Sequence, residues 1–300
     1  MFSPYADLSI FNIVLLVVAA LAPAVALAVF IFIKDRVEKE PIGLLLLLLL
    51  SGVLIIPPVI IVGTVLETVS EIAFAVLPET GMTIRLYYAN DAFINVALVE
   101  EGLKWLALII ITKRNKNFNS LFDGIIYATF VSLGFGGAEN ILYCVQNGWS
   151  TAIVRAILSV PGHTFFGVIM GLCYSLWHMY KKANVLEKDC KAKGLIPQNA
   201  PEYSYKKYAF LSLLLPILAH GLYDYCCFIG TPLSTLVLYS FVIFLYIFCF
   251  IKIGKMSRRD VSDVYYSKHL VVKKYPELLP VLYEEELKAL ENKEETPATV

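Results

Sequence analysis

The stretch IGLLLLLLLSGVLIIPPVIIVGTVL, residues 42–66, contains no charged side chain. A helix needs about 20 consecutive apolar residues to cross the hydrocarbon core of a bilayer. Because lipid offers no hydrogen-bond partners, the backbone must satisfy its own polar groups there, as a helix does. The stretch is therefore predicted to be a transmembrane helix, and the adjacent Pro57 and Pro58 predict a kink within it.

The composition of the whole chain supports this class. Of its 300 residues, 58% are hydrophobic and 17% are charged, and the mean hydropathy is +0.69. Soluble domains are roughly 45–50% apolar and about 25% charged. The six cysteines form no CxxC pair, so they predict neither a thiolate zinc site nor a disulfide framework. Membrane lipid is an expected partner, and no nucleic-acid partner is predicted.

Seven stretches are long and apolar enough to be transmembrane helices. They are residues 10–33, 42–66, 93–112, 121–145, 152–180, 208–229 and 232–252. We therefore expect an all-α, polytopic membrane helix bundle with about seven transmembrane helices. Residues 1–253 form the expected transmembrane domain, and 254–300 form a mixed-charge tail. Residues 67–79 have the apolar spacing of a short amphipathic helix at the membrane surface.

Lysine and arginine are concentrated in alternate connections between these helices. They follow the first and third predicted helices and fill the loop 181–207 and the tail, whereas the other side has only Arg85, plus Arg155 near the mouth of the fifth helix. Basic connections remain in the cytosol. We therefore expect a multi-pass membrane protein with the amino terminus outside and the carboxyl terminus in the cytosol. A bacterial or archaeal plasma membrane is the expected location.

Ionisable side chains inside the predicted helices are the main candidates for function. A charge at the bilayer centre costs about 2.5–3.5 kcal/mol on insertion scales. Those in or near the predicted spans are Glu100, Glu101, Lys104, Asp123, Glu139, His163, His220 and Asp224. Asp123 is a boundary residue at the cytosolic end. At 1.5 Å of helix rise per residue, the others lie roughly 8–17 Å below the outer surface, on four successive helices, and so predict one polar cavity.

Local spacing adds detail to this cavity. Lys104 lies one turn from both Glu100 and Glu101, so it can neutralise or orient either carboxylate. A packing triad is the structural alternative, but one lysine cannot balance two glutamates, and the surplus carboxylate needs a metal or a protonated histidine. Asp224, four residues after His220, can hold an imidazole N–H and so fix the ring.

Four motifs in this order resemble the PrsW family of intramembrane proteases. They are EExxK (Glu100, Glu101, Lys104), FxxxEN (Phe135, Glu139, Asn140), a mid-span histidine followed by glycine (His163, Gly167) and HxxxD (His220, Asp224). The family is grouped with CAAX prenyl endopeptidases and bacteriocin self-immunity proteins. The CAAX branch has EExxxR and FxxxH, so Lys104 and Glu139-Asn140 point to the PrsW branch. The resemblance covers about residues 93–229, the expected catalytic core.

The resemblance implies site-1 cleavage of single-span membrane proteins, of which anti-sigma factors are the best-known substrates. The predicted cavity in the outer half of the bilayer suits a cut near the extracytoplasmic boundary. Within it, we expect Glu100 or Glu101 to be the general base for water. His163 and His220 would stabilise the oxyanion or pass a proton, with Asp224 orienting His220. Lys104, Phe135 and Gly167 are supporting residues.

The role of a metal stays open on the sequence. Two histidines and a carboxylate are a familiar zinc set, for which Glu139, His163 and His220 are the candidates. Glu139 and Asn140 would otherwise position the substrate backbone. No HExxH motif is present, so a metal-free glutamate mechanism remains an equal alternative. A proton- or ion-coupled transporter and a catalytically silent membrane-binding protein are the rival functions.

Overall fold

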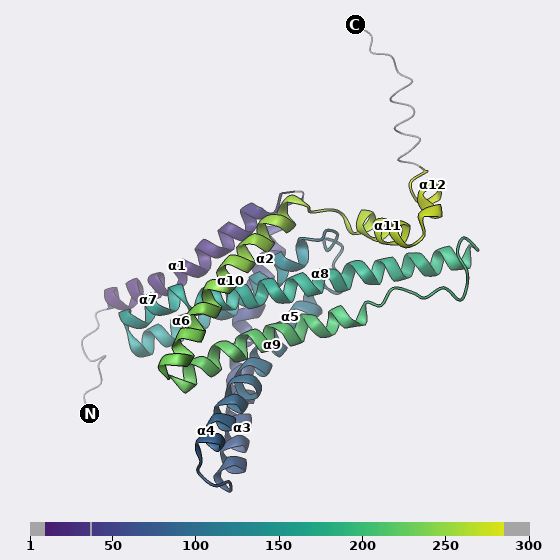
Figure 1. Ribbon diagram of the computed structural model, residues 1–300. Coiled ribbons are helices and arrows are strands. Elements are labelled where there is room, and N and C mark those ends of the chain that lie inside the picture. Colours follow the sequence, from purple (N-terminus) through teal and green to yellow (C-terminus); the bar gives the residue numbers. More distant parts are fainter. Residues whose placement is uncertain (1–9, 37, 285–300) are drawn as a thin grey trace, which may run out of the picture.

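The computed structural model describes residues 10–36 and 38–284, and all its regular elements over these residues are helices (Figure 1). Most of them form one bundle of long helices. The helices are α1 (Ile10–Lys34), α2 (Ile42–Leu54), α3 (Ile56–Ala75), α4 (Gly81–Asn90), the π-helix η1 (Asp91–Leu98), α5 (Val99–Thr112), α6 (Asp123–Asn147), α7 (Trp149–Ile157), α8 (Ser159–Ala192), α9 (Lys206–Ile229), α10 (Pro232–Arg258), α11 (Asp263–Lys274), the 3₁₀-helix η2 (Pro276–Leu278) and α12 (Leu279–Leu282).

The predicted all-α membrane bundle is confirmed. Six helical segments of the described chain are long and apolar enough to cross a membrane: α1, α2 with α3, α6, α7 with α8, α9, and α10. The predicted helix 93–112 is not among them. It is divided between η1 and α5, and α5 carries Glu100, Glu101 and Lys104 as buried side chains. These charged side chains lower the hydropathy of the segment. They are buried because the segment lines the interior of the protein.

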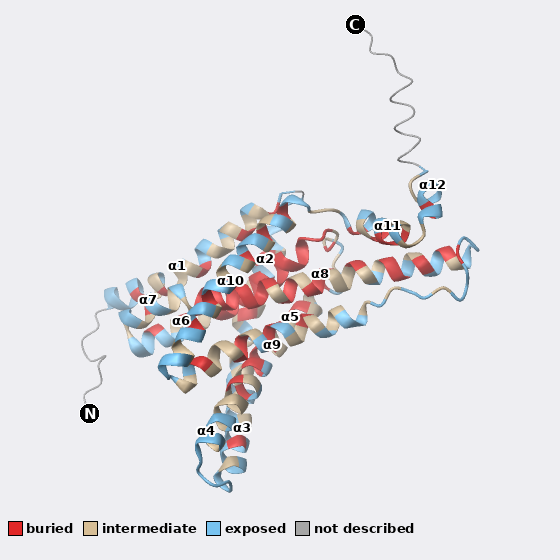
Figure 2. Ribbon diagram, viewed as in Figure 1, coloured by how far each residue is buried: buried red, intermediate tan, exposed pale blue. Residues whose placement is uncertain are grey.

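Helix α6 and the first half of α8 form the centre of the bundle and are its most buried parts (Figure 2). Glycines let α2 lie directly on α6. A Cβ atom on Gly52 would be 2.1 Å from the carbonyl oxygen of Val131, and one on Gly134 would be 1.9 Å from that of Leu49. Such distances leave no room for any side chain, so the two backbones are in contact.

The proline pair ends this close packing. Neither Pro57 nor Pro58 has an N–H to continue the hydrogen bonds of α2, and the helix is interrupted at Ile55, between α2 and α3. The predicted kink is thus confirmed, but the predicted surface helix 67–79 is not a separate element. Its residues 67–75 form the second half of α3, which ends at Ala75 and projects from the bundle beside α4, and residues 76–79 are not helical (Figure 1).

On another side of the bundle, α8 extends well past the other helices, and α11 packs against it (Figure 1). A small apolar cluster joins them, including Ala183, Cys190 and Val271. The predicted domain boundary after residue 253 falls inside α10, which continues to Arg258. The described first part of the tail is therefore helical and packed, while residues 285–300 lie outside the described residues.

Candidate active site

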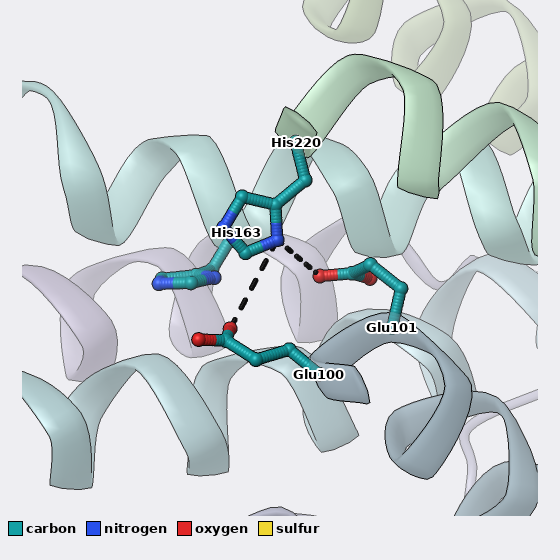
Figure 3. Close-up of side chains that lie close together, drawn as sticks. All are labelled: Glu100, Glu101, His163 and His220. Carbon is teal, nitrogen blue, oxygen red and sulfur yellow. Dashed lines mark hydrogen bonds and ion pairs between the residues drawn. The ribbon is translucent and has the colours of Figure 1, made fainter. Parts of the chain in front are cut away.

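Four side chains from three helices meet in the centre of the protein: Glu100 and Glu101 of α5, His163 of α8 and His220 of α9 (Figure 3). One ligand atom from each lies within 4.8 Å of the others, and all four residues are buried. The sequence predicted that these groups would lie in one layer. The structure brings them into direct contact.

The π-helix η1 leads directly into the two glutamates. A π-helix has more residues per turn than an α-helix, so it changes the face on which the following residues lie, and such segments are frequent at functional sites. Buried Asn95 secures η1, because its amide donates to Asp91 at 3.1 Å and its carbonyl accepts from Ser70 at 3.2 Å. The α5 side chains Glu100, Glu101 and Lys104 then all point inward.

Lys104 is the cation of the site and is completely buried. Its ammonium donates to Glu100 at 3.1 Å, to Glu101 at 2.8 Å and to Nδ1 of His163 at 3.2 Å. The ammonium also lies 4.0 Å from the centre of the Phe135 ring, a favourable cation–π contact. All three of its N–H groups therefore have acceptors, and the predicted pairing with both glutamates is confirmed.

His163 is held between α6 and the lysine. Its Nε2 lies 2.8 Å from Oε2 of Glu139. We assign the ring proton to Nε2, which then donates to Glu139, so that Nδ1 presents its lone pair to the centre of the site. A Cβ on Gly136 would lie 2.9 Å from the His163 ring, so this glycine makes the space that the imidazole occupies. The predicted position of Phe135 beside the site is also found, since its ring packs edge-on against His163.

Arg155, from the end of α7, is the site residue that sequence reasoning missed. Its guanidinium donates to Glu139 at 2.6 Å and to Asn140 at 3.0 Å. Asn140 in turn donates to the carbonyl of Ala20 at 2.8 Å, which ties α1 to the site. In the sequence, Arg155 is an isolated arginine on the side of the membrane that has almost no other basic residue. We used this only to predict the orientation of the helices and not as evidence for a site residue.

His220 shows where a proton or cation is needed. Its Nε2 lies 3.2 Å from Asp224, as the HxxxD spacing predicted, and Nδ1 lies 3.0 Å from Oε1 of Glu101 (Figure 3). When the Nε2–H of His220 donates to Asp224, Nδ1 and the Glu101 oxygen are both acceptors, so a proton or a metal ion must lie between them. The other Glu101 oxygen, Oε2, is buried without a hydrogen-bond partner.

The donor set fits a divalent transition metal. Two imidazole nitrogens and two carboxylates are ligands that zinc accepts, and the unpartnered Oε2 of Glu101 is a free ligand atom. The group differs from the predicted one because it does not include Glu139. Both Arg155 and His163 already contact Oε2 of Glu139, which therefore supports a histidine of the group.

Two cavities reach this group. The first cavity, of about 260 Å³, is lined by Glu100, Glu139, His163, His220, Asp224, Arg155 and apolar side chains. A second cavity, of about 280 Å³, lies between α3 and α6 and shares Glu100, Glu139 and Tyr143 with the first. Glu101 and Asn140 line neither cavity.

The remaining predicted residue, Gly167, lies away from the reacting groups. A Cβ at this position would be 2.6 Å from Oγ of Ser132, so Gly167 allows α8 to pack on α6. Its predicted role as a supporting residue stays a prediction.

Comparison with known proteins identifies the family. A family model described as "PrsW family intramembrane metalloprotease" matches residues 40–251. A protein named Protease PrsW from Geobacillus kaustophilus is 34% identical over 70% of this chain and 78% of its own length. The proteins of that name from Oceanobacillus iheyensis and Bacillus subtilis are 30% and 33% identical, each over 82% of this chain and 97% of their own. No solved structure matches the chain.

Proposed function

Because this chain belongs to the PrsW family of intramembrane metalloproteases, we propose that it cuts single-span membrane proteins near the outer side of the membrane, with Glu100 as general base. The chain is an intramembrane protease, a hydrolase that acts on membrane proteins, and this replaces the transporter and silent-binding alternatives. The proposal concerns its substrate type, its catalytic residues and its metal.

We assign the general base to Glu100 and not to Glu101 because only Glu100 is accessible from the cavities. A general base must reach both the attacking water and the substrate. Glu100 lines both cavities, whereas Glu101 is completely buried and lines neither. Glu100 would take the proton from the attacking water and deliver it to the leaving amine.

Glu101, His163 and His220 would hold the metal, which we propose to be zinc. Zinc bound there would act as a Lewis acid on the scissile carbonyl and its oxyanion. Supporting this set, Glu101 has a buried oxygen without a partner, and Nδ1 of each histidine faces the centre of the site. Glu100 also belongs to the group that could hold an ion, so it lies close enough to act on the same water.

The surrounding residues orient the histidines. Asp224 accepts from Nε2 of His220, and Glu139 accepts from Nε2 of His163, so each carboxylate would fix a ring and its tautomer. Arg155 fixes Glu139, and Asn140 fixes Arg155. We assign Glu139, Asn140 and Asp224 to positioning, which narrows the predicted catalytic set to Glu100, Glu101 and the two histidines.

The membrane setting follows from charge distribution. The basic connections support an outer amino terminus and a cytosolic carboxyl terminus, and we infer from them a site in the outer half of a bacterial plasma membrane. We propose substrates of the anti-sigma-factor type, cut at the first site of regulated proteolysis. The EExxK and HxxxD motifs support a distant relationship with the CAAX endopeptidases and bacteriocin self-immunity proteins.

Terminal-peptide proteomics on membranes of expressing cells tests this function. Wild type and Glu100→Gln are compared, with Glu277→Gln at an exposed position of η2 as the matched control. New termini near the outer edge of single-span proteins should be produced by wild type and by Glu277→Gln but not by Glu100→Gln. If all three membranes yield the same termini while the proteins are folded and inserted, the proposed activity is wrong.

A further inference from the structure

Helix α2 packs closely on α6, whereas α3 does not. The α2 backbone is in contact with α6 through Gly52 and Gly134, as described above. After the break at Ile55, α3 leaves α6 and runs out beside α4 (Figure 1). A wedge-shaped space, which we call the wedge, therefore opens between α3 and the C-terminal half of α6. It begins near the proline pair.

The second cavity occupies this wedge. Its walls are formed by three apolar residues of α3 and by three residues of α6: Ile56, Val59, Ile60, Leu142, Tyr143 and Gln146. Its floor is formed by Glu100, Phe135 and Glu139. An apolar entrance thus leads to the carboxylate that we propose as general base.

The walls of the wedge carry exposed apolar side chains. Ile60 is 55% exposed and Leu142 is 43% exposed, and both lie in helical segments that are long and apolar enough to cross a bilayer. The first cavity is lined by several charged side chains, including Arg155, His220 and Asp224, as well as by apolar ones. It therefore offers more charged groups to bound water than the second cavity, with which it shares Glu100, Glu139 and Tyr143.

We propose that the membrane-spanning segment of the substrate enters sideways from the lipid, between α3 and α6, while water reaches Glu100 through the first cavity. This inference rests on the proposed function and adds the route of the substrate. The wedge residues Ile60 and Leu142 would contact the substrate before cleavage. The α3–α4 pair, which extends from this opening, would lie alongside the arriving segment.

The floor of the wedge favours a peptide over a lipid chain. Glu100 and Glu139 present carboxylate oxygens there, and an acyl chain has no hydrogen-bond donor to offer them. An unwound peptide segment has free backbone N–H groups that must find acceptors within the membrane. Gln146 adds an amide at the wall, which can bond to a peptide group.

Bulky substitutions test the route. Ile60→Trp and Leu142→Trp would fill the wedge, and Ile243→Trp is the matched control because Ile243 on α10 is 59% exposed. In the proteomic assay, each wedge variant should reduce the wild-type-dependent termini by at least about tenfold. Ile243→Trp should stay within about twofold of wild type. Equal thermal stability of the three purified proteins ensures that a loss is not a folding defect.

Cross-linking separates the occupants. A photoreactive amino acid is placed at position 60 or at position 243 of the Glu100→Gln variant in native membranes. The proteins whose cleavage depends on the wild type should cross-link from position 60 and not from position 243. The route is wrong if those proteins cross-link equally from both positions, if position 60 captures only lipid, or if the wedge variants cleave normally. If the wild type produces no dependent termini, the proposed function itself fails, which is a different result.

Discussion

The ammonium of Lys104 lies 3.2 Å from Nδ1 of His163, in the centre of the four residues that could hold a metal. The same ammonium contacts Glu100 and Glu101 at 3.1 and 2.8 Å. A metal held by Glu101 and the two histidines would share these ligand atoms with the lysine. The charge of Lys104 and the charge of the metal therefore compete for one set of acceptors.

Replacing Lys104 with methionine should make the protein depend on metal for its stability. Removing one partner of a buried ion pair costs about 3–5 kcal/mol, because the other charge is left without compensation. In chelator, we expect Lys104→Met to unfold at a lower temperature than wild type, and we expect zinc to restore it. Zinc should raise the unfolding temperature of wild type less, because the ammonium already occupies the acceptors.

Thermal unfolding of the purified proteins in detergent, with chelator and then with zinc, measures this competition. Lys113→Met, at an exposed position beside the end of α5, is the control and should behave as wild type does. Were zinc to leave the stability of both wild type and Lys104→Met unchanged, the metal would not be held at this site.

Arg155 should act on the rate rather than on substrate binding. It fixes Glu139, which fixes His163, so its loss would misplace a ring that faces the reacting atoms. Loss of such supporting contacts typically costs about 10–100-fold in activity. We expect Arg155→Met to lower kcat by about this factor with little change in KM. Arg155→Lys should recover part of the rate, because lysine can still pair with Glu139.

The kinetics are measured on a substrate identified by the proteomic assay, with thermal stability as a check on folding. A raised KM with an unchanged kcat would mean that Arg155 contacts the substrate and does not position His163.

The contact between α2 and α6 should not tolerate a methyl group. A Cβ at Gly134 would lie 1.9 Å from the backbone oxygen of Leu49, which cannot move without shifting α2. Overpacking of this kind costs about 1–3 kcal/mol and occasionally more. Gly254→Ala in α10 meets nothing within 4 Å and should be neutral or slightly stabilising. The yield of monodisperse protein and its unfolding temperature distinguish the two, and equal values would contradict the close packing.

Stability should fall as the pH rises because of Glu40, which lies just before α2. Burial, together with the nearby charge of Asp123, raises the pKa of the Glu40 carboxyl from 4.5 to about 8. A carboxyl whose folded pKa is raised contributes stability that is fully present below about pH 4.5 and is lost as the pH rises through about 8. Burial also raises the pKa of Asp260, to about 6.

Glu40→Gln removes this titration. We expect the variant to unfold at a higher temperature than wild type at pH 8–9, and the difference to disappear near pH 5. Thermal unfolding across this pH range measures it, with exposed Glu67→Gln as the control. If the difference between Glu40→Gln and wild type does not change with pH, the carboxyl titrates normally in the folded protein.

Much of the site could be predicted because helices have a fixed rise and successive transmembrane helices alternate in direction. This placed Glu100, His163 and His220 at one depth before any contact was known. The spacing of His220 and Asp224 likewise predicted their pairing, which is found at 3.2 Å. The predicted helix 93–112 was harder to describe from the sequence. Its charged side chains are buried against other helices, and that packing is not visible in the sequence.

The residues that connect different helices were not visible in the sequence. Arg155 reaches Glu139 across the turn between α6 and α7, and their pairing depends on how both helices pack. The projection of the α3–α4 pair likewise depends on which part of α2 packs on α6. Nothing in residues 67–75 marks them as part of a longer helix that leaves the bundle.

The sequence by itself determined the membrane class, the helical bundle and the motifs that predict the family, because hydrophobic length, charge and residue spacing are local properties of the chain. Only the tertiary structure decided that Glu100 lines the cavities while Glu101 is enclosed, and that Glu139 supports His163. Those assignments depend on how far each helix is rotated about its axis. The rotation is determined by contacts between helices, such as that of Gly136 with His163, and not by any single helix.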